Sequence, residues 1–201
     1  HYPLRRQRQM CIRDSLITAG PTREGIDPVR FLSNRSSGRM GYALAHAFAH
    51  AHHQVRLVSG PTALDVPDHV DFIPIESAEE MRTATLTASP NFDVVICCAA
   101  VSDYRPVQCA TQKIKKNAAT LTLQLERTPD ILGSLRAHGF VGTLVGFAAE
   151  TENLETHARA KLLAKGCDLV IGNDVSQPGI GFDSEDNELL LVDPHGSILL
   201  P

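Results

Sequence analysis

The stretch ITAGPTREGIDPVRFLSNRSSGRMG, residues 17–41, decides the fold of this chain and carries its first candidate site. A short apolar run, residues 16–19, ends at Gly20-Pro21, and a polar loop comes next. Small residues then lead into an Ala-rich segment of strong helix formers, residues 42–51. This succession predicts a strand, a long polar loop, a tight turn and the start of a helix.

The turn before this helix has two interpretations. Small side chains let an anion approach the backbone N–H groups at the positive end of a helix, and the hydroxyls of Ser36 and Ser37 can donate as well. An ordinary helix cap followed by close packing of helix on sheet needs the same small residues, Gly38 included. Spacing alone leaves both interpretations open, because glycine-rich turns are common before helices.

Length and composition exclude several classes of protein. The 201 residues suffice for one domain with a substantial core, and the apolar share of 43% is ordinary. A formal charge of −4 argues against a broad attraction to nucleic acid. No apolar run approaches the length of a membrane span. The five cysteines form no C-x-x-C pair, which favours a reducing cytoplasm over a disulfide framework. We therefore expect a cytoplasmic protein with neither nucleic acid nor membrane as partner.

The first fifteen residues, HYPLRRQRQMCIRDS, differ in character from the rest of the chain. They hold four arginines and one acid and show no helical or strand periodicity. We interpret residues 1–15 as non-native or disordered, a remnant of cloning or of sequence assembly. The alternative is a natural basic tail. The domain then covers residues 16–201, with its first strand shortened at the N-terminal side.

The remainder of the sequence alternates between strand and helix patterns. Strands are expected at residues 16–19, 55–59, 70–75, 92–100, 143–148 and 168–172, and helices at 42–51, 77–89, 130–138 and 153–165. Ser77 and Glu80 have the spacing of a capping box at the start of the second of these helices. The end, residues 188–193 and 197–200, has the pattern of a β-hairpin. The fold class is therefore α/β, a Rossmann-like, mostly parallel sheet with helices on both faces and a C-terminal β-hairpin.

Ligands of such sheets gather at the carboxyl ends of the strands, so the loops leaving those ends are the places to search for chemistry. Residues 97–106, CCAAVSDYRP, come after a buried strand, and small residues there permit close backbone approach to a ligand. Asp103 can accept from a ribose or ligate a metal, or it can simply cap the loop. Lys113, Lys115 and Lys116 form either a solvated face or a cationic contact for phosphates.

Three later segments are equally ambiguous. Pro129 suits the first turn of a helix and Asp130 lies beside its positive end, so Asp130 is a cap, a metal ligand or both. Phe147 is a core aromatic or a ligand contact. Lys161 and Lys165 share one helical face, where surface lysines are the ordinary interpretation.

Two other groups of residues have the composition of a functional site, one of a metal centre and one of a nucleophile, but their context argues against either role. His46 and His50 have the i,i+4 spacing of metal ligands, but no H-E-x-x-H glutamate accompanies them. Cys97 and Cys98 lie in an expected buried strand, where cysteine behaves as a small hydrophobe rather than a nucleophile.

These motifs together resemble the phosphopantothenoylcysteine synthetase (phosphopantothenate–cysteine ligase) family. In most bacteria this enzyme is the C-terminal half of a bifunctional coenzyme A biosynthesis protein. The resemblance rests on ITAGPTRE…IDPVRFLSNRSSGRMG, AAVSDYRP, KIKK, PDIL and GFAAET, and it covers residues 16–201. The family's flavin-dependent decarboxylase half is not in this chain, and relatives continue past Pro201 into a further helix. The resemblance therefore implies a fragment.

The resemblance implies a CTP-dependent ligase that joins 4′-phosphopantothenate to L-cysteine through an acyl-cytidylate, releasing pyrophosphate and then CMP. It implies CTP as co-substrate and Mg²⁺, with FMN only in the decarboxylase half. It also implies a homodimer, with the decarboxylase domain as partner in the full-length protein. The choice of CTP over ATP rests on the bacterial style of the motifs, since nothing in the local physics selects cytosine.

The resemblance also implies roles for particular residues. Asn34 is the catalytic residue, and Arg30, Asn34 and Ala100 contact the substrate, Arg30 across a dimer interface. Asp103 and Asp130 are the metal candidates. The nucleotide contacts are Ser36, Ser37, Gly38, Cys97, Cys98, Ala99, Asp103, Lys113, Pro129, Asp130, Ile131, Leu132, Phe147, Lys161 and Lys165.

Two rival functions stay open. One is a nicotinamide-dependent oxidoreductase, against which stand the lack of G-x-G-x-x-G after the first strand and of an acid after Ser59-Gly60. The other is a non-catalytic nucleotide-binding module, in which Asn34 would be dispensable.

Overall fold

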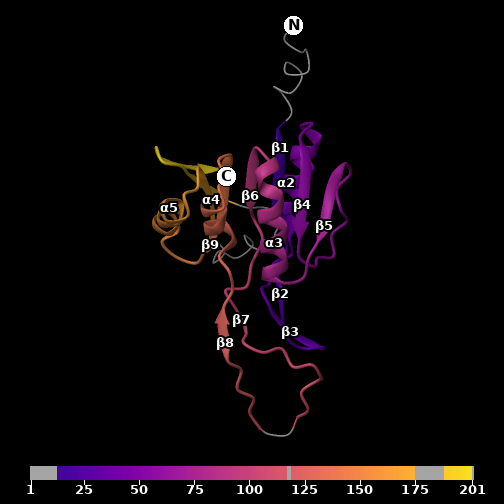
Figure 1. Ribbon diagram of the computed structural model, residues 1–201. Helices are drawn as coiled ribbons and strands as arrows, with labels where there is room; N and C mark the ends of the chain where they lie inside the picture. Colours follow the sequence, from indigo (N-terminus) through magenta and orange to yellow (C-terminus); the bar gives the residue numbers. More distant parts are fainter. Residues whose placement is uncertain (1–12, 117–118, 175–187, 201) are drawn as a thin grey trace.

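The computed structural model describes residues 13–116, 119–174 and 188–200. Within them the central sheet has eight strands in the order β12-β11-β10-β9-β6-β1-β4-β5 (Figure 1). The strands span Asp14–Ala19 (β1), Gln54–Ser59 (β4), Val70–Pro74 (β5), Val94–Cys97 (β6), Thr143–Glu150 (β9), Leu169–Asp174 (β10), Leu189–Val192 (β11) and Ser197–Leu200 (β12). All neighbouring pairs from β5 to β10 are parallel, whereas β11 and β12 add an antiparallel hairpin. The predicted fold class is confirmed.

The central strands are buried on both faces. In β1 every residue from Ser15 to Ala19 is buried, and Leu16 and Ile17 are fully so. Leu16 packs into one hydrophobic core and Ile17 into the other, because successive side chains of a strand point to opposite faces. A near-continuous apolar run is the pattern such a strand requires.

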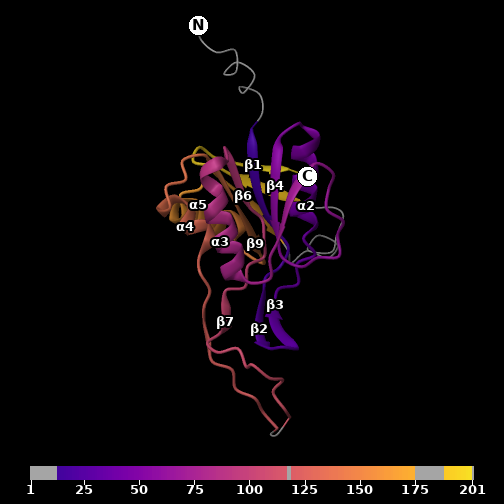
Figure 2. The same ribbon diagram turned by 45° about the vertical axis from the view of Figure 1, so that its right-hand side comes forward.

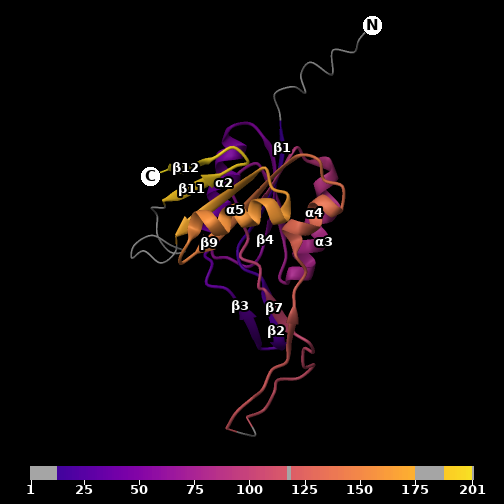
Figure 3. The ribbon, with the colours of Figure 1, turned by 90° about the vertical axis from the view of Figure 1, so that its left-hand side faces the viewer.

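Four α-helices of the described chain cover the two faces of the sheet. They span Arg39–His50 (α2), Ala78–Ala88 (α3), Ile131–Ala137 (α4) and Leu154–Lys165 (α5), and a short 3₁₀ turn, η1, covers Ser89–Asn91. Helix α2 packs on β1 and β4, on the face opposite to α3, α4 and α5 (Figures 2 and 3). The predicted capping box is present: the Ser77 side chain accepts from the Glu80 N–H, and the Glu80 side chain accepts from the Ser77 N–H.

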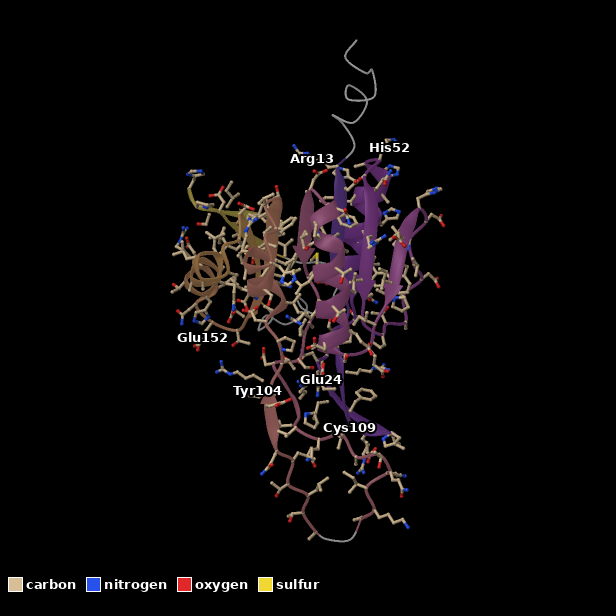
Figure 4. All side chains as sticks on the ribbon, in the orientation of Figure 1. Arg13, Glu24, His52, Tyr104, Cys109 and Glu152 are labelled. Atoms are coloured by element: carbon tan, nitrogen blue, oxygen red, sulfur yellow. The ribbon has the colours of Figure 1, made fainter. Side chains whose placement is uncertain are left out.

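Two antiparallel ribbons project from the carboxyl edge of the sheet, where the sequence patterns predicted only loops (Figure 1). One pairs β2, Arg23–Asp27, with β3, Arg30–Ser33, and the other pairs β7, Tyr104–Pro106, with β8, Leu125–Arg127. The prediction of a loop was wrong because these short polar strands carry neither clear alternation nor an apolar run. The buried Glu24 of β2 accepts from the Ala78 N–H at 2.9 Å and so attaches the first ribbon to α3 (Figure 4).

Several boundaries differ from those predicted. Strand β1 begins at Asp14, so two residues of the segment that we interpreted as non-native or disordered lie in the sheet, paired with Gln54 and Val55. The strand expected at 92–100 is confined to Val94–Cys97, and a single parallel bridge joins Ala100 to Pro21 beyond it. Within the described ranges no helix has the length and apolar character needed to cross a membrane. Residues 1–12 and 175–187 lie outside the described residues.

Candidate functional site

A cavity of about 980 Å³ opens at the carboxyl ends of β1, β6 and β9. The strand order reverses at β1, which pairs with β4 on one side and β6 on the other. Open α/β sheets bind their ligands at this kind of switch point. The volume lies at the upper end of the range for small-molecule sites.

All of the predicted site residues except Arg30 and Lys113 line this cavity. They come from the start of α2, the segment after β6, the start of α4, strand β9 and helix α5, five parts of the chain that are far apart in sequence. The lining residues among them are Asn34, Ser36, Ser37, Gly38, Cys97, Cys98, Ala99, Ala100, Asp103, Pro129, Asp130, Ile131, Leu132, Phe147, Lys161 and Lys165.

The turn into α2 packs closely on β1 but gives the helix no side-chain cap. Gly38 has a φ of 80°, a left-handed conformation that favours glycine, and its N–H donates to the Ser36 Oγ at 3.3 Å. At Gly41 a Cβ would lie 2.5 Å from the Ala19 Cβ, so the helix rests directly on β1. The first turn of α2 carries no acidic residue. Close packing of the helix on the sheet is therefore present, whereas anion binding at this turn stays a prediction. The turn presents the positive end of α2 to the cavity.

Asn34 is held at the mouth of the cavity by the segment after β6. Its Nδ2 donates to the Ala100 carbonyl at 3.1 Å, and the Thr22 N–H donates to the same oxygen at 3.3 Å. The Ala100 N–H in turn donates to the Gly20 carbonyl at 2.9 Å. The side-chain amide thus faces a backbone fixed on both sides, although Asn34 itself is exposed.

Lys161 and Lys165 form a cationic wall of the cavity. Lys161 Nζ donates to the Phe147 carbonyl, and Lys165 Nζ lies 2.5 Å from Asp130 Oδ2. Burial opposes ionisation of Asp130, but the hydrogen bonds from Lys165 and the Gly133 N–H outweigh it, so the pKa of Asp130 is lowered. Asp130 also caps α4 through the Gly133 N–H at 2.9 Å. Its carboxylate is an ionised cap and ion-pair partner.

The two cysteines at the end of β6 are poor nucleophiles. Burial raises the pKa of both Cys97 and Cys98 to about 12, so both thiols stay protonated near neutral pH. They contribute a small apolar wall instead.

Arg30 and Lys113 lie outside the cavity, in the projecting ribbons. Arg30 begins β3 and pairs with Asp27. Lys113 belongs to the long connection between β7 and β8, next to Ile114, which contacts both Asp27 and Arg30. The structure therefore brings these two predicted residues near each other but not to the remaining site.

Sequence reasoning missed part of the charge of the site. Among the described residues, Arg35, Arg39 and Arg127 line the cavity with Lys161 and Lys165, together with two carboxylates, Asp103 and Asp130. Arg35 and Arg39 belong to the stretch of residues 17–41, and the signal was their position on either side of Ser36-Ser37-Gly38. The excess of cations favours an anionic ligand.

No metal centre of three or more His, Cys, Asp or Glu side chains occurs in the part of the chain that the structure describes. His46 and His50 are exposed on α2, with parallel rings 6.3 Å apart, and neither lines the cavity. The assignment of Mg²⁺ to Asp103 and Asp130 stays a prediction.

Comparison with known families places the chain. The model of the family described as "DNA/pantothenate metabolism flavoprotein C-terminal domain" matches residues 11–200. The chain belongs to this family.

Members of the family are also recognisable by direct comparison. The coenzyme A biosynthesis bifunctional protein CoaBC of Vibrio vulnificus (strain YJ016) is 48% identical over 192 residues, 92% of this chain and 47% of the relative. CoaBC of Bacillus subtilis (strain 168) is 49% identical over 173 residues, 86% of this chain and 43% of the relative. A solved C-terminal domain of CoaBC is 43% identical with a TM-score of 0.80, covering 94% of this chain and 86% of that domain. The resemblance drawn from the motifs is confirmed, and the chain spans about half the length of these curated relatives.

Proposed function

We propose that this domain is a CTP-dependent ligase that joins 4′-phosphopantothenate to L-cysteine in coenzyme A biosynthesis. The observation that carries the proposal is the convergence of four of the five motif segments on one cavity. The described residues of its lining include five cationic side chains and two carboxylates. Similarity to the C-terminal domain of CoaBC supports the same reaction class.

The reaction needs activation because a carboxylate is a poor acyl donor to an amine. A carboxylate oxygen of phosphopantothenate attacks the α-phosphorus of CTP, the bond to the β-phosphate oxygen breaks, and pyrophosphate leaves. The amine of cysteine then attacks the acyl carbon, loses a proton, and displaces CMP as the amide forms. Each half-reaction concentrates negative charge where Lys161, Lys165 and the start of α2 line the cavity.

Asn34 is the residue that we propose for the second half-reaction. Its Nδ2 sits 3.1 Å from the Ala100 carbonyl, at the cavity mouth. An amide N–H placed there can donate to the acyl oxygen as negative charge develops on it. Phe147 is proposed for the nucleotide base, Arg30 for the phosphate of phosphopantothenate across a dimer interface, and Lys113 for the triphosphate.

Mg²⁺ fits the site through one carboxylate rather than through a protein cage. This ion keeps several waters and binds one or two carboxylates together with substrate phosphates. Asp103 lines the cavity and meets that requirement, whereas Asp130 would first have to release Lys165. Bound Mg²⁺ would offset the charge of the triphosphate.

The context of the domain is proposed from the relatives. Their bifunctional name supports a flavin-dependent decarboxylase as the partner domain in the full-length protein, with FMN confined to that half. A homodimer and a cytoplasmic location complete the proposal.

The decisive test is pyrophosphate release by the 201-residue chain with CTP, Mg²⁺ and 4′-phosphopantothenate, with and without cysteine. We expect release that depends on phosphopantothenate, and CMP only when cysteine is added. Asn34→Ala should still form the acyl-cytidylate but lose amide formation by about 10²–10³-fold, the usual cost of one oxyanion donor.

Four outcomes would contradict all or part of the proposal. Absence of pyrophosphate release from folded protein with either CTP or ATP rejects the ligase. Nucleotide binding without turnover supports a binding module, and preference for NAD(P) over CTP supports an oxidoreductase. Equal amide formation by Asn34→Ala and wild type removes Asn34 from the mechanism.

A further inference from the structure

Asp27 is a buried carboxylate surrounded by hydrogen-bond donors. It ends β2 and is only 4% exposed. Its Oδ1 accepts from the N–H groups of Val29 at 2.9 Å and Arg30 at 3.0 Å. Its Oδ2 accepts from the Arg30 guanidinium, through Nε at 3.0 Å and through Nη2, and from the Ile114 N–H at 3.0 Å. Oδ1 therefore binds backbone groups of the turn, whereas Oδ2 binds the Arg30 guanidinium and the backbone of Ile114.

The Oδ2 partners tie two distant segments together. Arg30 Nη2 also donates to the Ile114 carbonyl at 2.9 Å, so both backbone polar groups of Ile114 are engaged, its N–H by Asp27 and its C=O by Arg30. A further bond runs from the Ala110 N–H to the Ile26 carbonyl at 3.0 Å. Figure 4 shows Cys109 of the same segment beside the ribbon of β2 and β3. Residues 109–114 are thus docked along the ribbon.

A carboxylate is the group that this arrangement requires. The hydrogen bond from Arg30 outweighs the cost of burial and holds the pKa of Asp27 well below its usual range. An ionised carboxylate only accepts, so it satisfies donors on both oxygens at once. An asparagine that keeps its oxygen toward the N–H groups of Val29 and Arg30 would turn its NH₂ group against the guanidinium and the Ile114 N–H.

We propose that Asp27 is a positioning residue for the ligase reaction: its Oδ2 clasps Arg30 to Ile114 and fixes the point from which Lys113, Lys115 and Lys116 are presented. The kinetic consequence of this inference rests on the proposed function, whereas the existence of the clasp rests on the hydrogen bonds of Asp27 alone. The buried carboxylate of Asp27 thus holds two predicted ligand contacts in position: it binds Arg30, the substrate contact, directly, and it holds Lys113, the nucleotide contact, through the neighbouring Ile114.

The simpler role for Asp27 is to close the turn between β2 and β3. That role uses only Oδ1, which accepts from the residues two and three positions ahead. Asp193 provides a matched control, since its Oδ1 accepts from the N–H groups of His195 at 2.7 Å and Gly196 at 2.8 Å in the turn between β11 and β12. Asp→Asn at either position keeps the turn, and only at Asp27 does it break a clasp.

The test is limited trypsin digestion of the full chain without ligand, scored by mass spectrometry for cleavage after Lys113, Lys115 and Lys116. Asp27→Asn should raise the rate of these cleavages about tenfold, because they follow the open population of the segment and the clasp consists of charge-assisted bonds. Asp193→Asn should leave the rate unchanged. Wild-type rates for Asp27→Asn in folded protein would overturn the proposal.

A second variant covers the case in which Asp27→Asn fails to fold. Ile114→Pro removes the N–H group that donates a hydrogen bond to Asp27 and leaves the Asp27–Arg30 pair intact. The segment around Ile114 has no regular secondary structure that a proline would break. The variant should raise cleavage after Lys115 and Lys116, which are the sites to score because trypsin does not cut after a lysine that a proline follows. Unchanged cleavage in this variant would likewise reject the clasp.

Kinetics then separate positioning from stability alone. In the ligase assay Asp27→Asn should raise KM for both phosphopantothenate and CTP while Asp193→Asn changes neither. Faster cleavage with unchanged KM values would confine Asp27 to a structural role and overturn the positioning claim. Faster cleavage in a chain with no ligase activity would keep the clasp and reject the proposed function.

Discussion

At the scale of single residues, Asp130 shows how a residue type admits several functions until its partners are known. The sequence allowed a cap, a metal ligand or both. The structure gives its carboxylate two partners, the Gly133 N–H and Lys165, and thereby explains why Lys165 faces the cavity. Asp130 therefore orients Lys165, which we propose as a contact for the nucleotide.

Replacing Asp130 by asparagine should separate the cap from the ion pair. Asparagine caps helices as well as aspartate does, so only the pair with Lys165 is lost. The pair is half exposed, and its loss should cost only about 0.2–1 kcal/mol of unfolding free energy at pH 7. Because the folded pKa of Asp130 is lowered, the charge stabilises the fold above the unfolded pKa, and this contribution disappears as pH falls through the folded value.

Urea denaturation of wild type and Asp130→Asn at several pH values measures this effect. The two proteins should converge in stability as the pH approaches the folded pKa of Asp130. A gap that stays constant or widens toward acid pH would show that the pair with Lys165 does not account for the difference.

At the scale of elements, one arginine joins helices α4 and α5 to the amino-terminal ends of β9 and β10. Arg136 on α4 donates from Nε to the Gly166 carbonyl at 2.9 Å and from Nη1 to the carbonyls of Phe140 and Gly142, each at 2.9 Å. Its Nη2 lies 2.7 Å from Asp168 Oδ2, and Asp168 also accepts from the Leu144 N–H. The end of α5 and the starts of β9 and β10 thus meet at one guanidinium.

Arg136→Lys should therefore destabilise the domain although it keeps the charge. An ammonium group cannot reach four acceptors in a plane, so carbonyls are left without donors, at a cost of about 2–3 kcal/mol. Arg159→Lys is the control, because Arg159 makes an exposed pair with Glu155 at 3.5 Å and should change stability by less than about 0.5 kcal/mol. Equal losses in the two variants, measured by urea denaturation, would refute the account of Arg136.

The elements that could be predicted from sequence are those with their own apolar pattern. The strands around Ile17, Leu57 and Val95 and the capping box at Ser77 were read from local composition, because burial on both faces and helix capping leave a local signal. The ribbons of β2–β3 and β7–β8 could not be read, since long-range contacts such as Glu24 with Ala78 hold the first of them.

At the scale of the whole molecule, the candidate site arises from topology more than from any one motif. Parallel strands in the order β5-β4-β1-β6-β9-β10 place the ends of β1, β6 and β9 at one edge. The predicted residues that line the cavity gather around this edge from the start of α2, the segment after β6, the start of α4, strand β9 and helix α5. The exceptions, Arg30 and Lys113, lie on the projecting ribbons. Their distance from the cavity depends on pairings with residues more than eighty positions away, which local sequence patterns do not report.

The net charge of the whole molecule is negative, whereas its cavity is lined by an excess of cationic side chains. The chain carries a formal charge of −4, yet the described residues that line the site include five cations and two carboxylates. At 100 times its dissociation constant CTP should stabilise the fold by about 2.7 kcal/mol, a rise in Tm of roughly 5–10 °C. Replacing Lys161 and Lys165 by methionine should remove most of that shift, and added salt should weaken it, because the attraction is partly screened. Scanning calorimetry with CTP, CMP and pyrophosphate checks this, with Arg82→Met as the control, since Arg82 pairs with Glu79 on α3 and does not line the cavity. A shift by CTP that survives the double substitution at every salt concentration would place the triphosphate elsewhere.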